Sequence, residues 1–530
     1  MSQTEVFSSA AAAAPHMFAA EAGRDVFIQG GNALEAMLAM AATIAVAYPH
    51  MNGLGGDGFW LIREPRGKTR AIEACGFAGE KATISAYRKL EFDAIPARGP
   101  HAALTVPGAV GGWLLAHELS RSMGGRLPLA DLFANAIKHA REGLPTSASE
   151  ARTRPRDSHD LAKATGFAQT YFVDGDYPKV GAVRKFSALA GTLEHLASAG
   201  LADFHRGDIA REIAHDLDKI GSPVTREDLR RYQAQWRPPL NLVLRGRALH
   251  NVPPPTQGLA SLIILGIFER LGVKRADSFE HIHGLIEATK QAFAVRDDFI
   301  TDYDRLKGDP DDFLTPAALD RMAAAVSMTR AAPFPLPPSN GDTVWMGCVD
   351  KDGLAVSYIQ SVYWEYGSGC VLPRTGLLMQ NRGLAFSLDP KSLNPLEPGR
   401  RPFHTLNPAM AVFDDGRVMP YGAMGGDGQP QTQAQVFSRY MFGQGLAEAL
   451  DAPRFALGRT WGAASSLLAL ENRFDPSLVR ALENAGHDLV VNPAPYADVF
   501  GHAGGLIRHA RDGRIEAAHD PRSDGGAAGV

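Results

Sequence analysis

Thr343 has the residue type and the setting that best suit covalent chemistry in this chain of 530 residues, because its hydroxyl stands at the start of a strand-like run. A threonine hydroxyl attacks poorly unless a base lies beside it, and the nearest possible base is the residue's own α-amine. That amine is free only if the chain is cut between Asp342 and Thr343. Its pKa would then be about 7.7 to 8.0, which suits a general base near neutral pH. Taken alone, a threonine at such a place is more often structural, since its branched side chain suits a strand.

The segments on both sides of Thr343 predict how it would be held. Before it, Ala331–Asp342 is rich in proline, which indicates an exposed connection. After it, two alternating runs flank Lys351-Asp352-Gly353, a pattern that predicts a β-hairpin. A second hairpin is expected around Asp415-Gly416. Thr343 would therefore open a strand-rich part of the chain.

Helical patterns surround this strand-rich centre. Leu34–Ala47 is apolar nearly all round but shorter than the ~20 residues that cross a bilayer, so it predicts a buried helix and no membrane span. Leu127–Arg330 holds several helical patterns and is expected to be helical packing material. Further helices are expected near Gln431–Phe442 and Pro476–Ala485. Helices before and after strands predict a layered fold with sheet inside and helices outside.

A glycine-rich segment, "NGLGGDGFWLIRE", satisfies the G-x-G-x-x-G pattern through Gly53, Gly55 and Gly58. A dinucleotide site requires a strand before this loop and a helix after it. Here the predicted helix precedes the loop and the predicted strand follows it. The segment is therefore expected to be a tight turn where backbones pass closely.

Composition excludes several classes of function. A formal net charge of -4 offers no basic field for nucleic acid, and 45% hydrophobic with 21% charged residues is ordinary for a globular protein. Three cysteines are too few and too scattered for a disulfide framework or a thiolate metal site. The N-terminal alanine run lacks the basic start of a secretory signal, so a cytoplasmic enzyme is expected. No metal or organic cofactor is implied, and the chain is long enough for two domains or one large layered domain.

Blocks along most of the chain resemble those of the γ-glutamyltransferase family, among them "GGNALEAMLA", "TVPGAVGGW", "NGDTVWMGCVDKDGLAVSY", "RRPFHTLNP" and "GAMGGDGQPQ", in the family order. This family belongs to the N-terminal-nucleophile hydrolases, whose members cut themselves before the nucleophile. The resemblance implies an α/β (α+β) fold, a four-layer αββα sandwich with a peripheral helical region. It also implies a helix-rich large fragment, 1–342, that contributes to the sheets, and a small fragment, 343–530, that carries the nucleophile and the oxyanion hole and remains associated with the large one.

The same resemblance implies roles for other residues near Thr343. Gly425 and Gly426 match glycines whose backbone amides form an oxyanion hole, although an ordinary Gly-Gly turn would be preferred from composition alone. Ser361 matches a family threonine that hydrogen-bonds near the nucleophile, so we expect it to orient Thr343.

Residues that family members use to hold a γ-glutamyl head group are largely missing. Cys75 aligns with the arginine that clamps the α-carboxylate, and Tyr363 aligns with an asparagine after the hairpin. Ala385 aligns with the acidic residue that pairs with the α-amine. Burying the ammonium group of a substrate without a counter-charge would cost on the order of several kcal/mol of binding free energy. A glutathione-type substrate is therefore not favoured.

A new charge appears instead. Arg382 aligns with a neutral glutamine, and its guanidinium suits a carboxylate in bidentate contact, although a solvated loop arginine is an equal alternative. His404 could hydrogen-bond a second anionic oxygen, although a lone histidine is more often structural. Thr405 and Asn381, in the same blocks, are assigned to substrate binding as well, and Tyr363 would shorten the pocket.

These features predict an N-terminal threonine amidohydrolase that acts on a small amide bearing a carboxylate. Oxamate fits, and the chain most resembles the oxamate-hydrolysing branch of the family, which serves purine-nitrogen catabolism. The alternatives are a γ-glutamyl hydrolase or transferase, an acylase of cephalosporin type, and an uncleaved scaffold without activity. Partners would be the substrate and the two fragments of the chain, with no nucleic acid and no membrane, and a homo-oligomer is an open alternative to a monomer.

Overall fold

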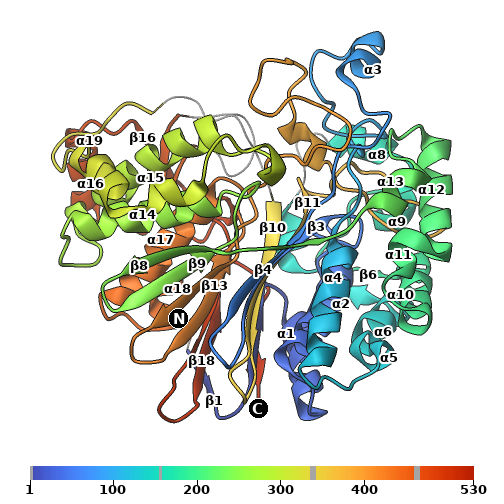
Figure 1. The fold of residues 1–530 in the computed structure, drawn as a ribbon, viewed down its shortest axis with the longest axis horizontal. Helices are drawn as coiled ribbons and strands as arrows, with labels where there is room; N and C mark the ends of the chain where they lie inside the picture. The colour runs from blue at the N-terminus through green and yellow to red at the C-terminus, as the bar shows by residue number, and fades with distance from the viewer. Residues whose placement is uncertain (1–3, 154–157, 335–341, 459–465) are drawn as a thin grey trace.

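The computed structural model describes residues 4–153, 158–334, 342–458 and 466–530. Two seven-stranded sheets lie face to face at the centre, and helices cover the outer face of each sheet (Figure 1). The layers therefore run helix, sheet, sheet, helix, as the four-layer prediction requires. We call the two sheets A and B.

Every neighbouring pair of strands in both sheets is antiparallel. Sheet A has the order β1 (Glu5–Phe7), β18 (Ile515–His519), β17 (Ala503–Arg508), β13 (Val418–Ala423), β12 (Ala409–Phe413), β9 (Arg247–Asn251) and β8 (Leu240–Leu244). Sheet B has the order β19 (Gly526–Gly529), β2 (Ala11–Ala14), β10 (Asp342–Val349), β11 (Ala355–Tyr363), β3 (Asp57–Arg63), β4 (Thr69–Ala74) and β7 (Gln235–Arg237).

Strands from both sides of Thr343 alternate within each sheet. In sheet B, β10 pairs with β2 on one edge and β11 pairs with β3, so strands that follow the predicted cut lie between strands that precede it. In sheet A, β12 pairs with β9 in the same way. A cut before Thr343 would leave these ladders intact, and separating the two pieces would break both sheets.

A thin apolar layer joins the facing sheets. Trp345 of β10, Met410 of β12 and Leu506 of β17 are buried in it together with Ala11 and Ala13 of β2. The Trp345 indole also donates a 2.9 Å hydrogen bond to the hydroxyl of Ser357. Gly422 and Gly504 lie directly against the indole, where a Cβ would come within 2.4 Å of ring atoms. Small residues in sheet A thus make room for this ring.

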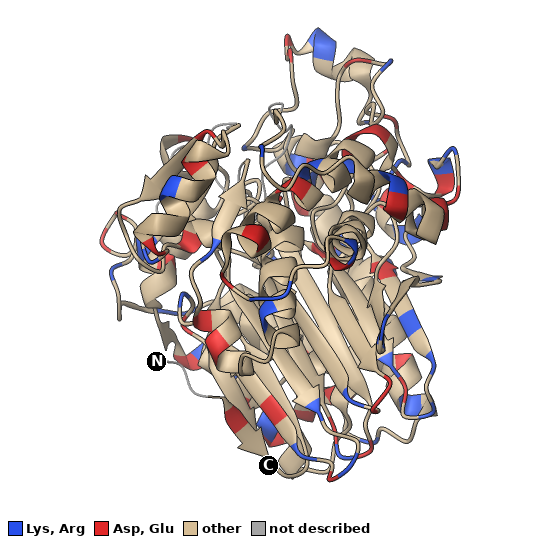
Figure 2. Ribbon diagram, turned by 90° about the vertical axis from the view of Figure 1, so that its left-hand side faces the viewer, with Lys and Arg blue, Asp and Glu red and all other residues tan. Residues whose placement is uncertain are grey.

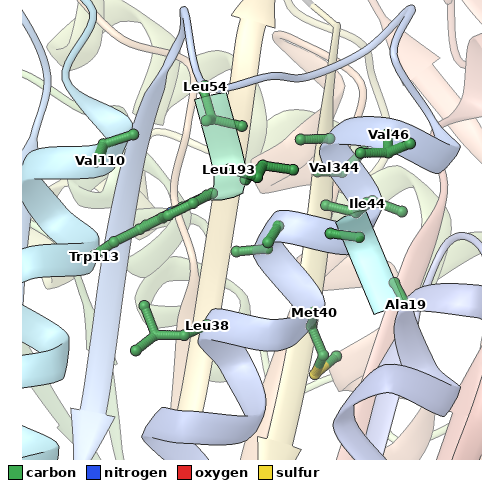
Figure 3. Close-up of a cluster of buried hydrophobic side chains, with 14 of the residues drawn as sticks. Ala19, Leu38, Met40, Ile44, Val46, Leu54, Val110, Trp113, Leu193 and Val344 are labelled. Carbon is green, nitrogen blue, oxygen red and sulfur yellow. The ribbon is translucent and has the colours of Figure 1, made fainter. Parts of the chain in front are cut away.

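The helical layer on sheet B contains α1 (Met17–Ile28), α2 (Ala33–Ala47) and α4 (Ala109–Ser122). Every residue of α2 is buried, as the apolar pattern of Leu34–Ala47 predicts. The helix begins with a capping box, in which the Asn32 side chain accepts from the Glu35 amide and the Glu35 carboxylate accepts from the Asn32 amide. Figure 3 shows α2 side chains packed with Trp113 of α4 and Val344 of β10, so the strand that carries Thr343 is fixed against this layer.

The helical layer on sheet A contains α14 (Gly258–Arg270), α15 (Phe279–Phe299), α17 (Gly428–Met441) and α18 (Leu446–Asp451). Around it lie α16 (Pro316–Ala324), α19 (Pro476–Asn484) and a small sheet of β14 (Phe455–Leu457), β15 (Leu468–Glu471) and β16 (Leu489–Asn492). The helix expected at Gln431–Phe442 is confirmed as α17, which begins three residues earlier, and the one expected at Pro476–Ala485 is α19.

The predicted peripheral helical region extends beyond α4. It contains α5 (Leu129–Leu132), α6 (Ala134–Glu142), α7 (Ala148–Arg152), α8 (Ser158–Lys163), α9 (Phe167–Tyr171), α10 (Ser187–Ala199), α11 (Asp203–Arg206), α12 (Asp208–Ile220) and α13 (Arg226–Arg231), with the short strands β5 (Leu144–Pro145) and β6 (Val183–Arg184). The remaining elements are α3 (Ile84–Lys89), η1 (Tyr303–Arg305), η2 (Pro310–Leu314), η3 (Arg382–Ala385) and η4 (Asp498–Phe500).

The prediction that Leu127–Arg330 is helical packing material is wrong for residues 235–251, which form strands. β7, β8 and β9 lie within this range, and β8 and β9 complete sheet A. Leu240, Leu242 and Leu244 of β8 are buried while the residues between them are exposed, which is the two-residue period of a half-buried strand. The signal was present in the sequence but was not separated from the helical patterns on either side.

Both predicted hairpins are confirmed. β10 and β11 flank the turn at Lys351-Asp352-Gly353, and β12 and β13 flank the turn at Asp415-Gly416. Gly353 and Gly416 have φ of 90° and 84°, the left-handed region that such turns require. Of the expected connection Ala331–Asp342, residues 335–341 lie outside the described residues, and the part before them has no regular structure.

Charged side chains of both signs are interspersed over the molecule, as Figure 2 shows and as the small net charge leads one to expect. Within the described residues, none of the helices combines the length and the apolar character needed to span a membrane.

Candidate active site

Thr343 lies in an irregularity at the start of β10. Asp342 pairs with Tyr363 and Val344 pairs with Gln360, so the single residue Thr343 stands opposite two residues of β11. This is a β-bulge, a feature that re-aims a side chain and is frequent beside active sites. Thr343 is fully buried. The Asp342 side chain lies outside the described residues.

The first turn of α17 contacts the Thr343 hydroxyl. Gln429 donates from Nε2 to Thr343 Oγ1 at 3.2 Å. Gly425 and Gly426 form the turn just before this helix, with φ of 121° and 53°, values that favour glycine. Neither backbone N–H donates a hydrogen bond within the described chain. The two glycines therefore lie at the electropositive N-terminal end of α17, the end from which Gln429 contacts Thr343.

A buried polar network holds this turn. Gln257 Nε2 donates to the carbonyl oxygens of Thr405 and Gly426, each at 2.8 Å. Arg296 Nη1 lies 3.2 Å from Gln257 Oε1 and 3.2 Å from Asp427 Oδ1. Gln257 thus ties the predicted oxyanion turn to the predicted substrate loop.

Arg382 is buried, with 1% of its surface exposed, which excludes the alternative of a solvated loop arginine. Its Nη1 donates to Thr405 Oγ1 at 3.3 Å, and its guanidinium carbon lies 3.5 Å from the ring centre of Tyr363. The other donors, Nε and Nη2, have no hydrogen-bond partner among the described residues. Burial lowers the pKa of Arg382, and the charges of neighbouring groups including Asp57 and Asp427 oppose that shift. Unused buried donors on a cation are typical of a site built for an anion.

His404 and Asp57 lie next to this cation. His404 Nε2 is 3.4 Å from Asp57 Oδ2, and both side chains are buried. Burial lowers the pKa of His404 well below its usual range, and the positive charge of Arg382 lowers it further. The histidine is therefore neutral and can donate from one ring nitrogen only.

Two other predicted site residues have contacts of a supporting kind. The Ser361 hydroxyl accepts from the Tyr363 amide at 2.8 Å. The Asn381 side chain accepts from the Trp364 amide at 3.1 Å and donates to the Ala97 carbonyl at 3.0 Å. Both fix the backbone at the end of β11, where Tyr363 has φ of 83°. Orientation of Thr343 by Ser361 and substrate binding by Asn381 stay predictions.

The positions that lack γ-glutamyl-binding residues are closed or apolar. Cys75 is buried, and burial raises the pKa of its thiol well above the usual range, so it is a neutral packing residue. Ala385, at the end of η3, lines a pocket of about 500 Å³ together with Arg296, Phe403 and Phe386. Leu384, two residues after Arg382 in the chain, also lines this pocket, whereas Arg382 itself does not.

Sequence reasoning missed Asp57, Gln257, Arg296 and Gln429. Two of these residues lie in segments already described, Asp57 in the glycine-rich segment and Gln429 in "GAMGGDGQPQ". A polar side chain inside a segment that is otherwise glycine, proline or apolar was the available signal.

Comparison with known proteins decides the family. The family model described as Gamma-glutamyltranspeptidase matches residues 19–530. The chain belongs to this family. Among members, the oxamate amidohydrolase proenzyme of Klebsiella pneumoniae subsp. pneumoniae is 50% identical over 531 residues, which cover both chains completely. The glutathione hydrolase-like YwrD proenzyme of Bacillus subtilis is 36% identical over 520 residues, 97% of each chain.

Solved structures of similar proteins agree with the γ-glutamyltranspeptidase assignment. The cephalosporin acylase from Bacillus halodurans superposes with a TM-score of 0.91 at 32% identity, covering 100% of this chain and 97% of that one. The family resemblance and the α/β sandwich fold are thus confirmed. The individual site residues stay predictions.

Proposed function

We propose that this protein is a self-processing amidohydrolase that converts oxamate to oxalate and ammonia. The observation that carries the proposal is the buried Arg382, which keeps two donors without partners beside the bulge that holds Thr343. Two relatives that cover at least 97% of the chain are named as proenzymes, and the one at 50% identity is named for oxamate. The hydrolase, amidohydrolase and acylase names of the family members support a C–N hydrolase.

Self-processing would begin at the bulge. Thr343 Oγ attacks the carbonyl carbon of Asp342, the Asp342–Thr343 amide bond breaks, and an ester joins the two residues while the freed amine gains the hydroxyl proton. Water hydrolyses this ester and restores the Thr343 hydroxyl. The products are the fragments 1–342 and 343–530, held together by the interleaved sheets.

Substrate hydrolysis would repeat the attack with a different carbonyl. The Thr343 amine takes the hydroxyl proton as Oγ attacks the oxamate amide carbon, and the amides of Gly425 and Gly426 stabilise the oxyanion. The same proton passes to the leaving nitrogen, ammonia departs, and an oxalyl ester remains on Thr343. Water then releases oxalate. Gln429 positions the nucleophile and Gln257 positions the oxyanion turn.

The anion site would select the substrate. In oxamate the carboxylate is bonded directly to the amide carbon, so a short pocket ending in a guanidinium can hold both groups. Arg382 would bind the carboxylate through Nε and Nη2, with Thr405 and Tyr363 holding the arginine in place. A γ-glutamyl group would need a cation for its carboxylate and an anion for its amine, and Cys75 and Ala385 supply neither.

The test is ammonia release by the mature protein from oxamate, compared with release from glutamine and from a γ-glutamyl chromophore. We expect oxamate to be preferred by kcat/KM. Preference for the γ-glutamyl compounds would favour a γ-glutamyl hydrolase or transferase. Preference for a bulky acyl amide would favour an acylase, and the similar solved structure at 32% identity is named as a cephalosporin acylase.

A further inference from the structure

The two oxygens of the Asp57 carboxyl group differ in their hydrogen bonding. Its Oδ1 accepts hydrogen bonds from the amides of Gly76 and Gly108, both at 3.0 Å. Its Oδ2 is buried and has no hydrogen-bond partner among the described residues. A buried carboxylate oxygen without a donor is costly, and such an atom calls for an explanation in a ligand or a proton.

His404 faces that unused oxygen and is held rigidly. Its Nε2 lies 3.4 Å from Asp57 Oδ2, and the ring of Phe59 packs on it at 5.0 Å between centres. Its backbone amide donates to Pro255 at 2.8 Å and its carbonyl accepts from Gln257 at 3.0 Å. Both ring nitrogens are buried without a partner in the described chain. Which ring nitrogen of His404 carries the single proton therefore depends on the groups that face the ring, among them Asp57 Oδ2.

The groups that face Asp57 are one cation and several titratable side chains that are neutral. Among the described residues, Arg382 of η3 is the cation that acts on Asp57. Cys75, Tyr232 and Tyr358 face it from other elements, and burial raises the pKa of each of them above the ordinary value, so they are neutral. Burial raises the pKa of Asp57 itself to about 7, although the amides of Gly76 and Gly108, the Gln380 side chain and Arg382 oppose the shift.

We propose that Asp57 is a positioning residue of the anion site, which sets the tautomer of His404 by carrying or losing a proton on Oδ2. With the proton in place, Oδ2 donates to His404 Nε2, the ring proton lies on Nδ1, and Nδ1 can donate to a carboxylate. Without it, His404 Nε2 donates to the carboxylate of Asp57, and Nδ1 presents a lone pair that repels an anion. The inference rests on the proposed function only in taking Arg382 as an anion site.

The consequence is that anion binding takes up a proton. A carboxylate beside Arg382 adds negative charge near Asp57 and therefore favours its protonated form. Above the pKa of Asp57, the affinity for a small carboxylate should fall by up to about tenfold per pH unit, because one proton must be bound with each anion. A neutral amide of the same size needs no such proton.

Asp57→Asn is the informative variant, because its Nδ2 donates to His404 Nε2 at every pH as the protonated acid would. The experiment is calorimetric binding of oxalate to the mature protein between pH 6 and 9, in buffers of different ionisation enthalpy, which reports proton uptake. Wild type should take up little of this proton at pH 6 and close to one at pH 9, and should bind more weakly as pH rises above about 7. Asp57→Asn should take up fewer protons than wild type, leaving only the part that the Thr343 amine of the mature protein contributes, since the ordinary pKa of that amine is about 7.7 to 8.0. Asp350→Asn changes a buried aspartate of raised pKa at the far end of the β10–β11 hairpin and should behave as wild type.

Equal proton uptake by wild type and Asp57→Asn would overturn the inference. If Asp57→Asn does not fold, His404→Phe serves instead, and persistence of the pH profile in that variant would also overturn it. Absence of oxalate binding at any pH would remove the anion site and this inference together. Proton-linked oxalate binding without turnover of oxamate would contradict the proposed substrate while supporting the role of Asp57.

Discussion

The guanidinium carbon of Arg382 lies 3.5 Å from the ring centre of Tyr363, and Tyr363 pairs in the sheet with Asp342, the residue before the predicted cut. Tyr363 itself has φ of 83°, a conformation that is strained for a tyrosine and occurs mostly at functional sites. The proposed anion site and the proposed processing site are thus joined through a single residue, Tyr363. Its aromatic face holds the cation in place, and its backbone continues the strand opposite the bulge.

Arg382→Lys tests the fork geometry of this site. A lysine keeps the charge but loses the bidentate fork and the stacking on Tyr363. The variant should therefore lose about 2 to 5 kcal/mol of transition-state stabilisation, measured as a fall in kcat/KM for oxamate. Steady-state kinetics on oxamate and on the neutral diamide oxamide would measure the difference. A similar loss on both substrates would contradict a carboxylate-binding role.

Gln257→Leu tests the link between the oxyanion turn and the substrate loop. The carbonyl oxygens of Gly426 and Thr405 would lose their donor. The activation barrier should rise by about 1 to 3 kcal/mol. We expect this as a fall in kcat that is larger than the change in KM. Gln435→Leu is the matched control, since this buried glutamine bonds the backbone of Phe455 away from the site. Both variants should lose stability, and only Gln257→Leu should lose kcat.

Gly425→Ala tests the oxyanion turn directly. Its φ of 121° is closed to alanine, so the turn must change and an amide donor be displaced, with a loss of about 2.7 to 4 kcal/mol of transition-state stabilisation. Gly443→Ala introduces the same methyl group at a φ of 94° in a loop after α17 with open space around it. Kinetics of both variants should show a loss of kcat for Gly425→Ala alone.

Acid should destabilise the fold from about pH 6.5 downward. Burial lowers the pKa of His281 and of His519 to about 3, whereas unfolded histidine titrates near 6.5. Between these values the unfolded chain binds protons that the folded protein does not, so stability is full above about 6.5 and is lost as pH falls. Each such histidine contributes up to about 1.4 kcal/mol per pH unit. Urea unfolding of wild type and His519→Asn at pH 7, 6 and 5 would measure the slope, which should be shallower in the variant.

Local patterns predicted much of the architecture. The hairpin turns carry glycine where φ must be positive, and the all-apolar run of Leu34–Ala47 can only be a core helix, so neighbours in sequence decided these elements. β8 and β9 were missed because a short two-residue period lay between longer helical patterns. Their place in sheet A depends on pairing β9 with β12, and no short pattern reports such a contact.

The candidate site was predictable only where the family blocks mark it. Thr343, Gly425, Gly426, Arg382 and His404 come from those blocks. Gln257 was missed because its function depends on a hydrogen bond to Gly426, 169 residues away in the chain. Asp57 was read as part of a glycine turn, since its buried, half-satisfied carboxyl group appears only when His404 is brought beside β3.

The most direct test of the account is the intact mass of the purified protein together with N-terminal sequencing of its small fragment. Wild type should give two chains, 1–342 and 343–530, the second beginning with Thr343, and oxamate hydrolysis should appear only in the cleaved form. Thr343→Ala should remain a single chain of 530 residues without activity. A wild-type protein that hydrolyses oxamate with an unbroken backbone would contradict the account.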